Sequence, residues 1–184
     1  MNDRQLYDLL LLGSLAAAAV TALFLLFVAA PYGRHVRRGW GPTMDNRLGW
    51  IVMEAPAPLV FALCFMVGEY RNTVTALVFL LMWEAHYIHR SFIYPFSLRG
   101  TGKRMPVVIA GVGFLFNALN GYLNGRWVYT FSGGYPNSWL LDPRFVVGCL
   151  IFVAGFIINR QADRTLRDMR ENGGSGYAVP QGGM

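Results

Sequence analysis

The sequence has few of the residues that build disulfide scaffolds, metal centres and charged surfaces. It contains two cysteines, Cys64 and Cys149, both inside apolar segments, and no Cys/His spacing typical of a zinc site. Only 14% of its 184 residues are charged, whereas 54% are hydrophobic. Because a soluble domain of this size needs a polar coat, the scarcity of charge argues against a soluble protein.

Common nucleotide-binding and hydrolase motifs are also missing. The sequence has no P-loop and no Gly-x-Ser-x-Gly elbow. Gly111 and Gly113 lie inside an apolar run with no preceding strand, so they do not form a Rossmann phosphate loop. Any dinucleotide must therefore be held by helices and loops.

Long apolar runs are what the sequence has instead. The first uncharged run, Leu9 to Ala30, has 22 residues, and about 20 helical residues cross a hydrocarbon core. It is too long for a signal peptide, and its start carries Asp3 and Asp8, so we expect an uncleaved span. We predict an all-α polytopic membrane protein, a single membrane domain over residues 1–184. Its five transmembrane helices are expected at 6–30, 48–68, 73–96, 105–123 and 144–164.

The basic residues predict an orientation, because cytoplasmic loops carry an excess of Lys and Arg. Most of the 16 fall on one side of this topology, at Arg34, Arg37, Arg38, Arg47, Arg90, Arg99, Lys103, Arg104, Arg160, Arg164, Arg167 and Arg170. The other side has Arg4, Arg71, Arg126 and Arg144. We therefore expect the N-terminus outside, and loops 31–49 and 97–105 and the C-terminus in the cytoplasm. This distribution between spans does not indicate nucleic-acid binding.

Ionisable residues inside spans are costly and mark either a polar site or a partner. Glu54 lies within the second span and has two interpretations, a structural ion pair between helices or a site residue. In the third span Glu84, Tyr87, Ser91 and Tyr94 fall on one helical face. His89 and Arg90 can be explained by snorkelling to the interface, but a buried Tyr87 phenol needs a partner.

Two further polar stripes occur in the last two spans. Asn117, Asn120 and Asn124 share a helical face, which interhelical hydrogen bonding alone can explain. Asn159, Asp163, Arg167 and Arg170 share another. That second stripe fits either positive-inside topology with lipid headgroup binding or a nucleotide site, since arginine forks grip phosphates.

At these segments the chain resembles the steroid 5α-reductase family (3-oxo-5-alpha-steroid 4-dehydrogenases). The matching stretches occur in the family's order over about residues 31–183, and the ordered set is more specific than any one of them. They are Pro31-Tyr-Gly-Arg-His35, Trp50-Ile-Val-Met-Glu-Ala-Pro56, His86-Tyr-Ile-His-Arg-Ser-Phe-Ile-Tyr94, Asn120-Gly-Tyr-Leu-Asn-Gly125, Tyr135-Pro136, Asp142-Pro-Arg-Phe145, Gly155-Phe-Ile-Ile-Asn159, Asp163, Leu166-Arg167 and Tyr177-Ala-Val-Pro-Gln-Gly-Gly183.

The resemblance implies a seven-helix membrane fold and NADPH-dependent reduction of the C4–C5 double bond of a 3-oxo-Δ4 steroid or related enone lipid. It implies that Glu54 and Tyr87 hold the keto oxygen, with Glu54 protonated or sharing a proton with Tyr87, and that Met53 and Asn120 contact the substrate. The implied nucleotide-site residues are Tyr32, Asn159, Asp163, Arg167 and Arg170, with Arg90, Arg99 and Arg104 as further phosphate candidates. No metal is expected, and a monomer is favoured.

The sequence departs from the family pattern at three points. Met53 stands where the family commonly has Gln, and Ala178 where it often has a basic residue. The family continues for two more spans past Gly183, so we expect this chain to be a fragment of a longer protein. Two alternatives stay open: a membrane methyltransferase of the isoprenylcysteine type that uses S-adenosylmethionine, and a non-enzymatic lipid- or haem-binding scaffold.

Overall fold

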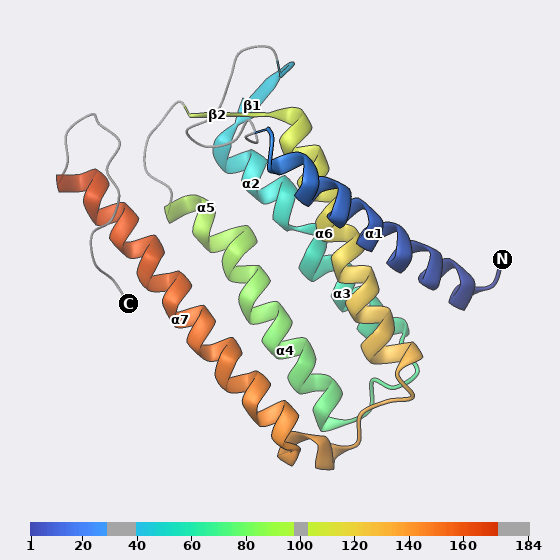
Figure 1. Cartoon of the computed structure of the whole chain (residues 1–184). Helices are drawn as coiled ribbons and strands as arrows, with labels where there is room; N and C mark the ends of the chain where they lie inside the picture. Colours follow the sequence, from blue (N-terminus) through green and yellow to red (C-terminus); the bar gives the residue numbers. More distant parts are fainter. Residues whose placement is uncertain (29–39, 98–102, 173–184) are drawn as a thin grey trace. The chain divides into compact units, whose positions relative to one another are not determined.

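The computed structural model describes residues 1–28, 40–97 and 103–172, and within α7 it leaves out the side chains of 166–167 and 169–172. The chain divides into two compact units, Met1–Tyr135 and Pro136–Met184. The first unit contains α1 (Asp3–Leu25), α2 (Asn46–Glu54), α3 (Pro56–Val67), α4 (Val74–Ile88), η2 (His89–Ile93), α5 (Tyr94–Ser97), α6 (Val107–Arg126) and η3 (Trp127–Phe131) (Figure 1). The all-α prediction is confirmed.

A proline pair divides the second predicted span into α2 and α3. Asp45 caps α2 by accepting from the main-chain N–H groups of Arg47 and Leu48. Ala55 separates the two helices, and Pro56 opens α3, where its missing N–H costs nothing. Pro58 also lacks an N–H, so the carbonyl of Glu54 has no helical donor four residues on. Glu54 therefore ends α2 at a break inside the span, which is where a polar side chain is easiest to accommodate.

The third predicted span is one continuous helical stretch with a wide turn in it. Helix α4 passes into the π-helix η2, where the N–H of Tyr94 donates to the carbonyl of His89, and then into α5. Pro95 follows directly and cannot donate to the preceding turn. Such π turns are frequent at functional sites, and this one carries Arg90.

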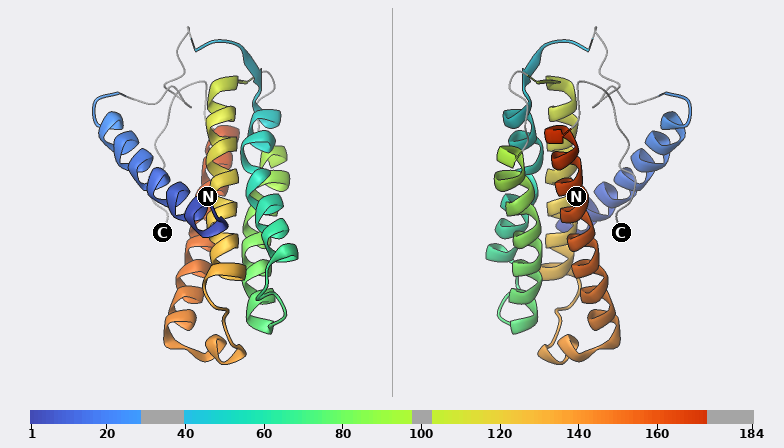
Figure 2. Two further views of the ribbon diagram at one scale, coloured as in Figure 1. Left: turned by 90° about the vertical axis from the view of Figure 1, so that its right-hand side faces the viewer. Right: turned by 90° about the vertical axis from the view of Figure 1, so that its left-hand side faces the viewer.

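Helix α6 lies close against α2 and α3 (Figures 1 and 2). A stripe of small residues on α6 forms this contact. Gly121, Gly125 and Asn117 are buried at four-residue intervals on one face of α6. A Cβ at Gly125 would lie 2.6 Å from the Cβ of Cys64, and one at Gly121 would lie 2.9 Å from the carbonyl oxygen of Ala57. Small residues at such spacing let membrane helices approach closely.

We expect Gly125→Ala to destabilise the protein by about 1–3 kcal/mol, because the added methyl group overpacks the α3–α6 contact. Gly111→Ala is the matched control on the same helix, since nothing lies within 4 Å of a Cβ built there. Thermal unfolding in detergent should show a lower Tm for the first variant and no decrease for the second. Equal Tm values for the two variants would contradict this packing.

Two short strands join the loops that flank these helices. β1 (Thr43–Asp45) pairs antiparallel with β2 (Arg104–Pro106), with Met44 opposite Met105. The N–H of Val107 also donates to the carbonyl of Pro42 at 2.9 Å. The ladder holds the starts of α2 and α6 at the same end of the unit, and the sequence analysis did not predict it.

The second unit consists of η4 (Asn137–Leu141) and α7 (Pro143–Asn172). Asp142 accepts from the main-chain N–H of Arg144 at 2.9 Å and pairs with its guanidinium at 2.8 Å. Hydrogen bonds from Arg144 lower the pKa of the Asp142 carboxyl to about 2. An Asp cap followed by Pro143 in the first turn explains why the helix begins here.

Burial in the first unit is arranged as in a membrane protein. Many large apolar side chains face outward, including Leu12, Leu115 and Phe116, while Glu54, Thr75, Ser91 and Asn117 are buried. Within the described residues four helical stretches are long and apolar enough to cross a bilayer, Asp3–Leu25, Asn46–Val67, Val107–Phe131 and Pro143–Thr165. The chain is thus a multi-pass integral membrane protein.

The number of spans differs from the five predicted. The predicted span 73–96 corresponds to α4, η2 and α5, of which α4 alone has 15 residues. Its second half carries Glu84, His86, His89 and Arg90, which lower its hydropathy, so it is not among the four stretches. The polar residues that mark this segment as a candidate site also lower its mean hydropathy.

Candidate active site

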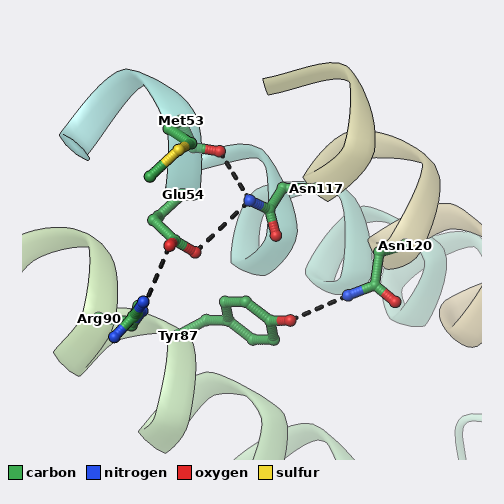
Figure 3. A network of polar contacts seen from close by, with 6 residues as sticks. All are labelled: Met53, Glu54, Tyr87, Arg90, Asn117 and Asn120. Atoms are coloured by element: carbon green, nitrogen blue, oxygen red, sulfur yellow. Dashed lines mark hydrogen bonds and ion pairs between the residues drawn. The ribbon is translucent and has the colours of Figure 1, made fainter. Parts of the chain in front are cut away.

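Glu54 is the buried acid at the centre of the site, with only 7% of its surface exposed. The Nε of Arg90 donates to its Oε1 at 3.2 Å. The Asn117 amide donates to the carbonyl oxygen of Met53 at 2.9 Å and lies 3.5 Å from Oε2 of Glu54. Both carboxylate oxygens therefore face donors, one from η2 and one from α6 (Figure 3).

Arg90 contacts two aromatic rings in addition to Glu54. Its guanidinium carbon lies 4.8 Å from the ring centroid of Trp50 and 5.2 Å from that of Tyr94. The two rings meet edge to face with centroids 5.2 Å apart. Cation–π attraction strengthens away from water, so α2 and α5 together fix the direction from which Arg90 approaches Glu54.

Tyr87 projects from α4 toward α6, and its ring lies on the same side of α4 as the Glu54 carboxylate (Figure 3). The Asn120 amide donates to the Tyr87 hydroxyl at 2.9 Å. The phenol ring packs against Trp83, with centroids 4.8 Å apart, and against His86, at 4.9 Å. Trp83 is itself anchored by donation to the carbonyl of Ala57 at 3.1 Å. Packing and a hydrogen bond together fix the phenol.

The hydrogen-bond chain continues along α6. The Asn124 amide donates at 2.9 Å both to the side-chain oxygen of Asn120 and to its main-chain carbonyl. Asn124 is exposed, Asn120 is half-buried, and the two are one turn apart. Both polar atoms of the Asn120 side chain are thereby engaged.

Comparison with known proteins decides the family. The model of a family described as 3-oxo-5-alpha-steroid 4-dehydrogenase matches residues 103–184. The steroid 5-alpha-reductase DET2 of Arabidopsis thaliana is 37% identical over 186 residues, covering 98% of this chain and 71% of the plant protein. The 3-oxo-5-alpha-steroid 4-dehydrogenase 1 of Bos taurus is 35% identical over 188 residues, covering 100% of this chain and 72% of its own length. The chain belongs to the steroid 5α-reductase family. The family is one of oxidoreductases, as the names of these relatives state.

The structure of this family member brings together five of the residues singled out in the sequence. Met53 and Glu54 come from α2, Tyr87 from α4, Arg90 from η2 and Asn120 from α6 (Figure 3). Asn117 was noted only as part of a polar stripe, yet it contacts the Glu54 carboxylate. Its spacing from Asn120 and Asn124 was the available signal, but that signal does not say which member faces the acid.

The other predicted residues of this steroid 5α-reductase relative lie elsewhere or outside the described part. Arg104 is exposed on β2, where its Nε donates to the Thr43 hydroxyl at 2.7 Å. Asn159 and Asp163 lie on α7 in the second unit, Asn159 exposed and Asp163 half-buried. Tyr32 and Arg99 fall outside the described residues, as do the side chains of Arg167 and Arg170. Among the described residues no group of three or more His, Cys, Asp and Glu side chains could hold a metal ion.

Proposed function

We propose that this chain carries the substrate site of an NADPH-dependent reductase that saturates the C4–C5 double bond of a 3-oxo-Δ4 steroid or a related enone lipid. The observation that carries the proposal is that a half-buried phenol, Tyr87, and a buried acid, Glu54, lie near each other between α2, α4 and α6 (Figure 3). Each is held by its own hydrogen bond from α6, Tyr87 by Asn120 and Glu54 by Asn117. The names of the plant and bovine relatives supply the reaction class.

The phenol fits the electronic demand of enone reduction. Addition of hydride at C5 moves negative charge through the conjugated system onto the keto oxygen. A fixed O–H donor at that oxygen stabilises the enolate as it forms, and it does so more strongly where water is excluded. Tyr87 is such a donor, because Asn120 already supplies the hydrogen bond that its oxygen accepts. The proton that completes the reaction is delivered at C4.

Glu54 contributes differently from Tyr87. The Arg90 guanidinium balances a carboxylate at Glu54, and its Oε2 faces the Asn117 amide. A bare carboxylate repels a keto oxygen, so Glu54 adds a second hydrogen bond only when it carries a proton or shares one with Tyr87. Tyr87 supplies an O–H in either state. The substrate contact of Met53 stays a prediction, since its side chain packs against Gly113 of α6 and against the cluster around Trp50 and Met105.

The polar side chains of α7 are of the types that bind a dinucleotide. Asn159 and Asp163 stand one turn apart, an amide and a carboxylate suited to ribose hydroxyls and the nicotinamide amide. Arg167 and Arg170 follow on the same helix, where guanidinium groups suit phosphates. When bound, NADPH supplies the hydride. Tyr32, Arg90, Arg99 and Arg104 stay predictions as nucleotide-binding residues, and the described hydrogen bonds of Arg90 and Arg104 are with Glu54 and Thr43.

Two contacts support the proposed orientation, with the N-terminus outside and the loops 31–49 and 97–105 cytoplasmic. The β1–β2 ladder ties parts of those two loops together, so they lie on one side of the bilayer. Arg126 at the end of α6 pairs with Asp3 at 2.7 Å, which keeps the N-terminus with the opposite end of α6. Each contact joins segments that the basic-residue count assigns to the same side.

The test is turnover by the protein in its full natural length, purified in detergent. We expect a 3-oxo-Δ4 steroid with NADPH to give the 5α-reduced product, and NADPH to raise the Tm while S-adenosylmethionine leaves it unchanged. Stabilisation by S-adenosylmethionine alone would favour the methyltransferase instead. The absence of reduction with every 3-oxo-Δ4 steroid and enone lipid tried would refute the reductase.

A further inference from the structure

We infer that Asn120 and Asn124 are positioning residues that fix the direction of the Tyr87 O–H bond and so select a ligand that accepts a hydrogen bond. The inference rests on the proposed function for the identity of that ligand, but the hydrogen-bond direction itself follows from the contacts of this chain. It assigns Asn120 a role through Tyr87 rather than a direct contact with substrate.

The main-chain carbonyl of Asn120 sets the direction of the hydrogen bonds that run from Asn124 through Asn120 to Tyr87. A main-chain carbonyl oxygen can only accept, so the Asn124 atom 2.9 Å from the carbonyl of Asn120 is the amide nitrogen. The same nitrogen lies 2.9 Å from a side-chain atom of Asn120, which must therefore be the acceptor, Oδ1. The remaining polar atom of Asn120 is its nitrogen, and this is the atom that faces Tyr87. Each step leaves one assignment.

This direction leaves the hydrogen of the Tyr87 hydroxyl available to a ligand. A tyrosine hydroxyl has a single hydrogen, and here the oxygen accepts from Asn120. In the part of the chain that the structure describes, no other group is hydrogen-bonded to this hydroxyl, so its hydrogen is available to an acceptor such as a keto oxygen. With the opposite direction, Tyr87 would donate to Asn120 and present lone pairs, which repel a keto oxygen.

The location of Asn124 makes the idea testable without altering the site itself. Asn124 is exposed and lies one helical turn from Asn120, at the end of this series of hydrogen bonds that is away from Tyr87. It is not hydrogen-bonded to Tyr87 in the described residues. Asn124→Asp replaces the donor with a group of the same shape that only accepts. The Asn120 amide is then expected to turn its nitrogen to the new Asp side chain and its oxygen to Tyr87. The Tyr87 hydroxyl would donate its hydrogen to that oxygen and would have none to donate to a ligand.

The experiment compares the affinities of a 3-oxo-Δ4 steroid and of the same steroid without the 3-oxygen. We expect Asn124→Asp to reduce the ratio of the two affinities about tenfold, the cost of losing a hydrogen bond to a buried polar group. Asn124→Ala, which releases the Asn120 amide without reversing it, should reduce the ratio less. If both variants weaken the two ligands equally, their role is only structural and the inference is overturned.

A spectroscopic measurement on the ligand-free protein separates this inference from the proposed function. Ultraviolet resonance Raman spectra distinguish a tyrosine that accepts from one that donates, and subtraction of the Tyr87→Phe spectrum isolates Tyr87. We expect an accepting phenol in the unmodified protein and a donating phenol in Asn124→Asp. An unchanged spectrum overturns the inference whatever the turnover, whereas the expected change in a protein without enone reduction overturns only the proposed function.

Discussion

Replacing Tyr87 with phenylalanine is expected to lower kcat for enone reduction by about 100- to 1,000-fold, the usual effect of removing one donor from an oxyanion site. The hydroxyl is needed mainly where charge develops on the keto oxygen, so KM should change much less than kcat. The ring keeps its contacts with Trp83 and His86, so the fold should not change. Steady-state kinetics with a 3-oxo-Δ4 steroid and NADPH measure the effect.

Tyr122→Phe is the matched control. Tyr122 lies on α6 of the same unit, where its ring is 6.5 Å from that of Tyr7, and it stands apart from the Glu54 network. We expect this variant to keep its kcat within about twofold, as for a residue that contributes no transition-state contact. A Tyr87→Phe enzyme as active as the Tyr122→Phe enzyme would remove the phenol from the mechanism.

The second large effect is expected at the ion pair of Glu54 and Arg90. The two side chains are 10% and 29% exposed, so the pair is neither fully buried nor a surface contact. Breaking a buried pair by removing one partner typically costs about 3–5 kcal/mol, and partial exposure of Arg90 reduces this to about 2 kcal/mol here. We expect Glu54→Leu and Arg90→Met each to lower the Tm in detergent clearly.

The double variant tests whether the two residues act as a pair. Glu54→Leu with Arg90→Met should cost less than the sum of the single variants by about 1–2 kcal/mol, because neither charge is left alone. The exposed pair of Arg4 and Asp8 is the control, with side chains 49% and 48% exposed. Its coupling should stay below about 0.5 kcal/mol. Additive costs at Glu54 and Arg90 would mean that their contact is incidental.

Much of the fold could be predicted because bilayer crossing imposes long apolar helices. Each predicted span overlaps a helix, and Pro56, Pro95 and Pro143 mark places where helices begin or change their turn. The β1–β2 ladder was not predicted, since three-residue strands leave too short a pattern to recognise. The prediction of one membrane domain stays a prediction, because each compact unit is described only by itself.

The candidate site was predictable in its members but not in its connections. Glu54 was singled out because a charge in an apolar span is costly, and Tyr87 because a buried phenol needs a partner. Arg90 was assigned to snorkelling or to a nucleotide phosphate, so its ion pair with Glu54 was not predicted. Two interpretations of Glu54 were weighed, an ion pair and a site residue; the ion pair with Arg90 is observed, and the site role stays a proposal. That Asn117 faces Glu54 while Asn120 faces Tyr87 depends on the rotation of α6 against α2 and α4, which a helical pattern alone does not fix.

The most direct test is the infrared carbonyl frequency of a bound 3-oxo-Δ4 steroid labelled with carbon-13 at C3. If the Tyr87 hydroxyl donates to the keto oxygen, the band lies at lower frequency in the unmodified protein than in an apolar solvent, and it moves back up in Tyr87→Phe. A band at the same frequency in both proteins would show that the keto group binds away from Tyr87.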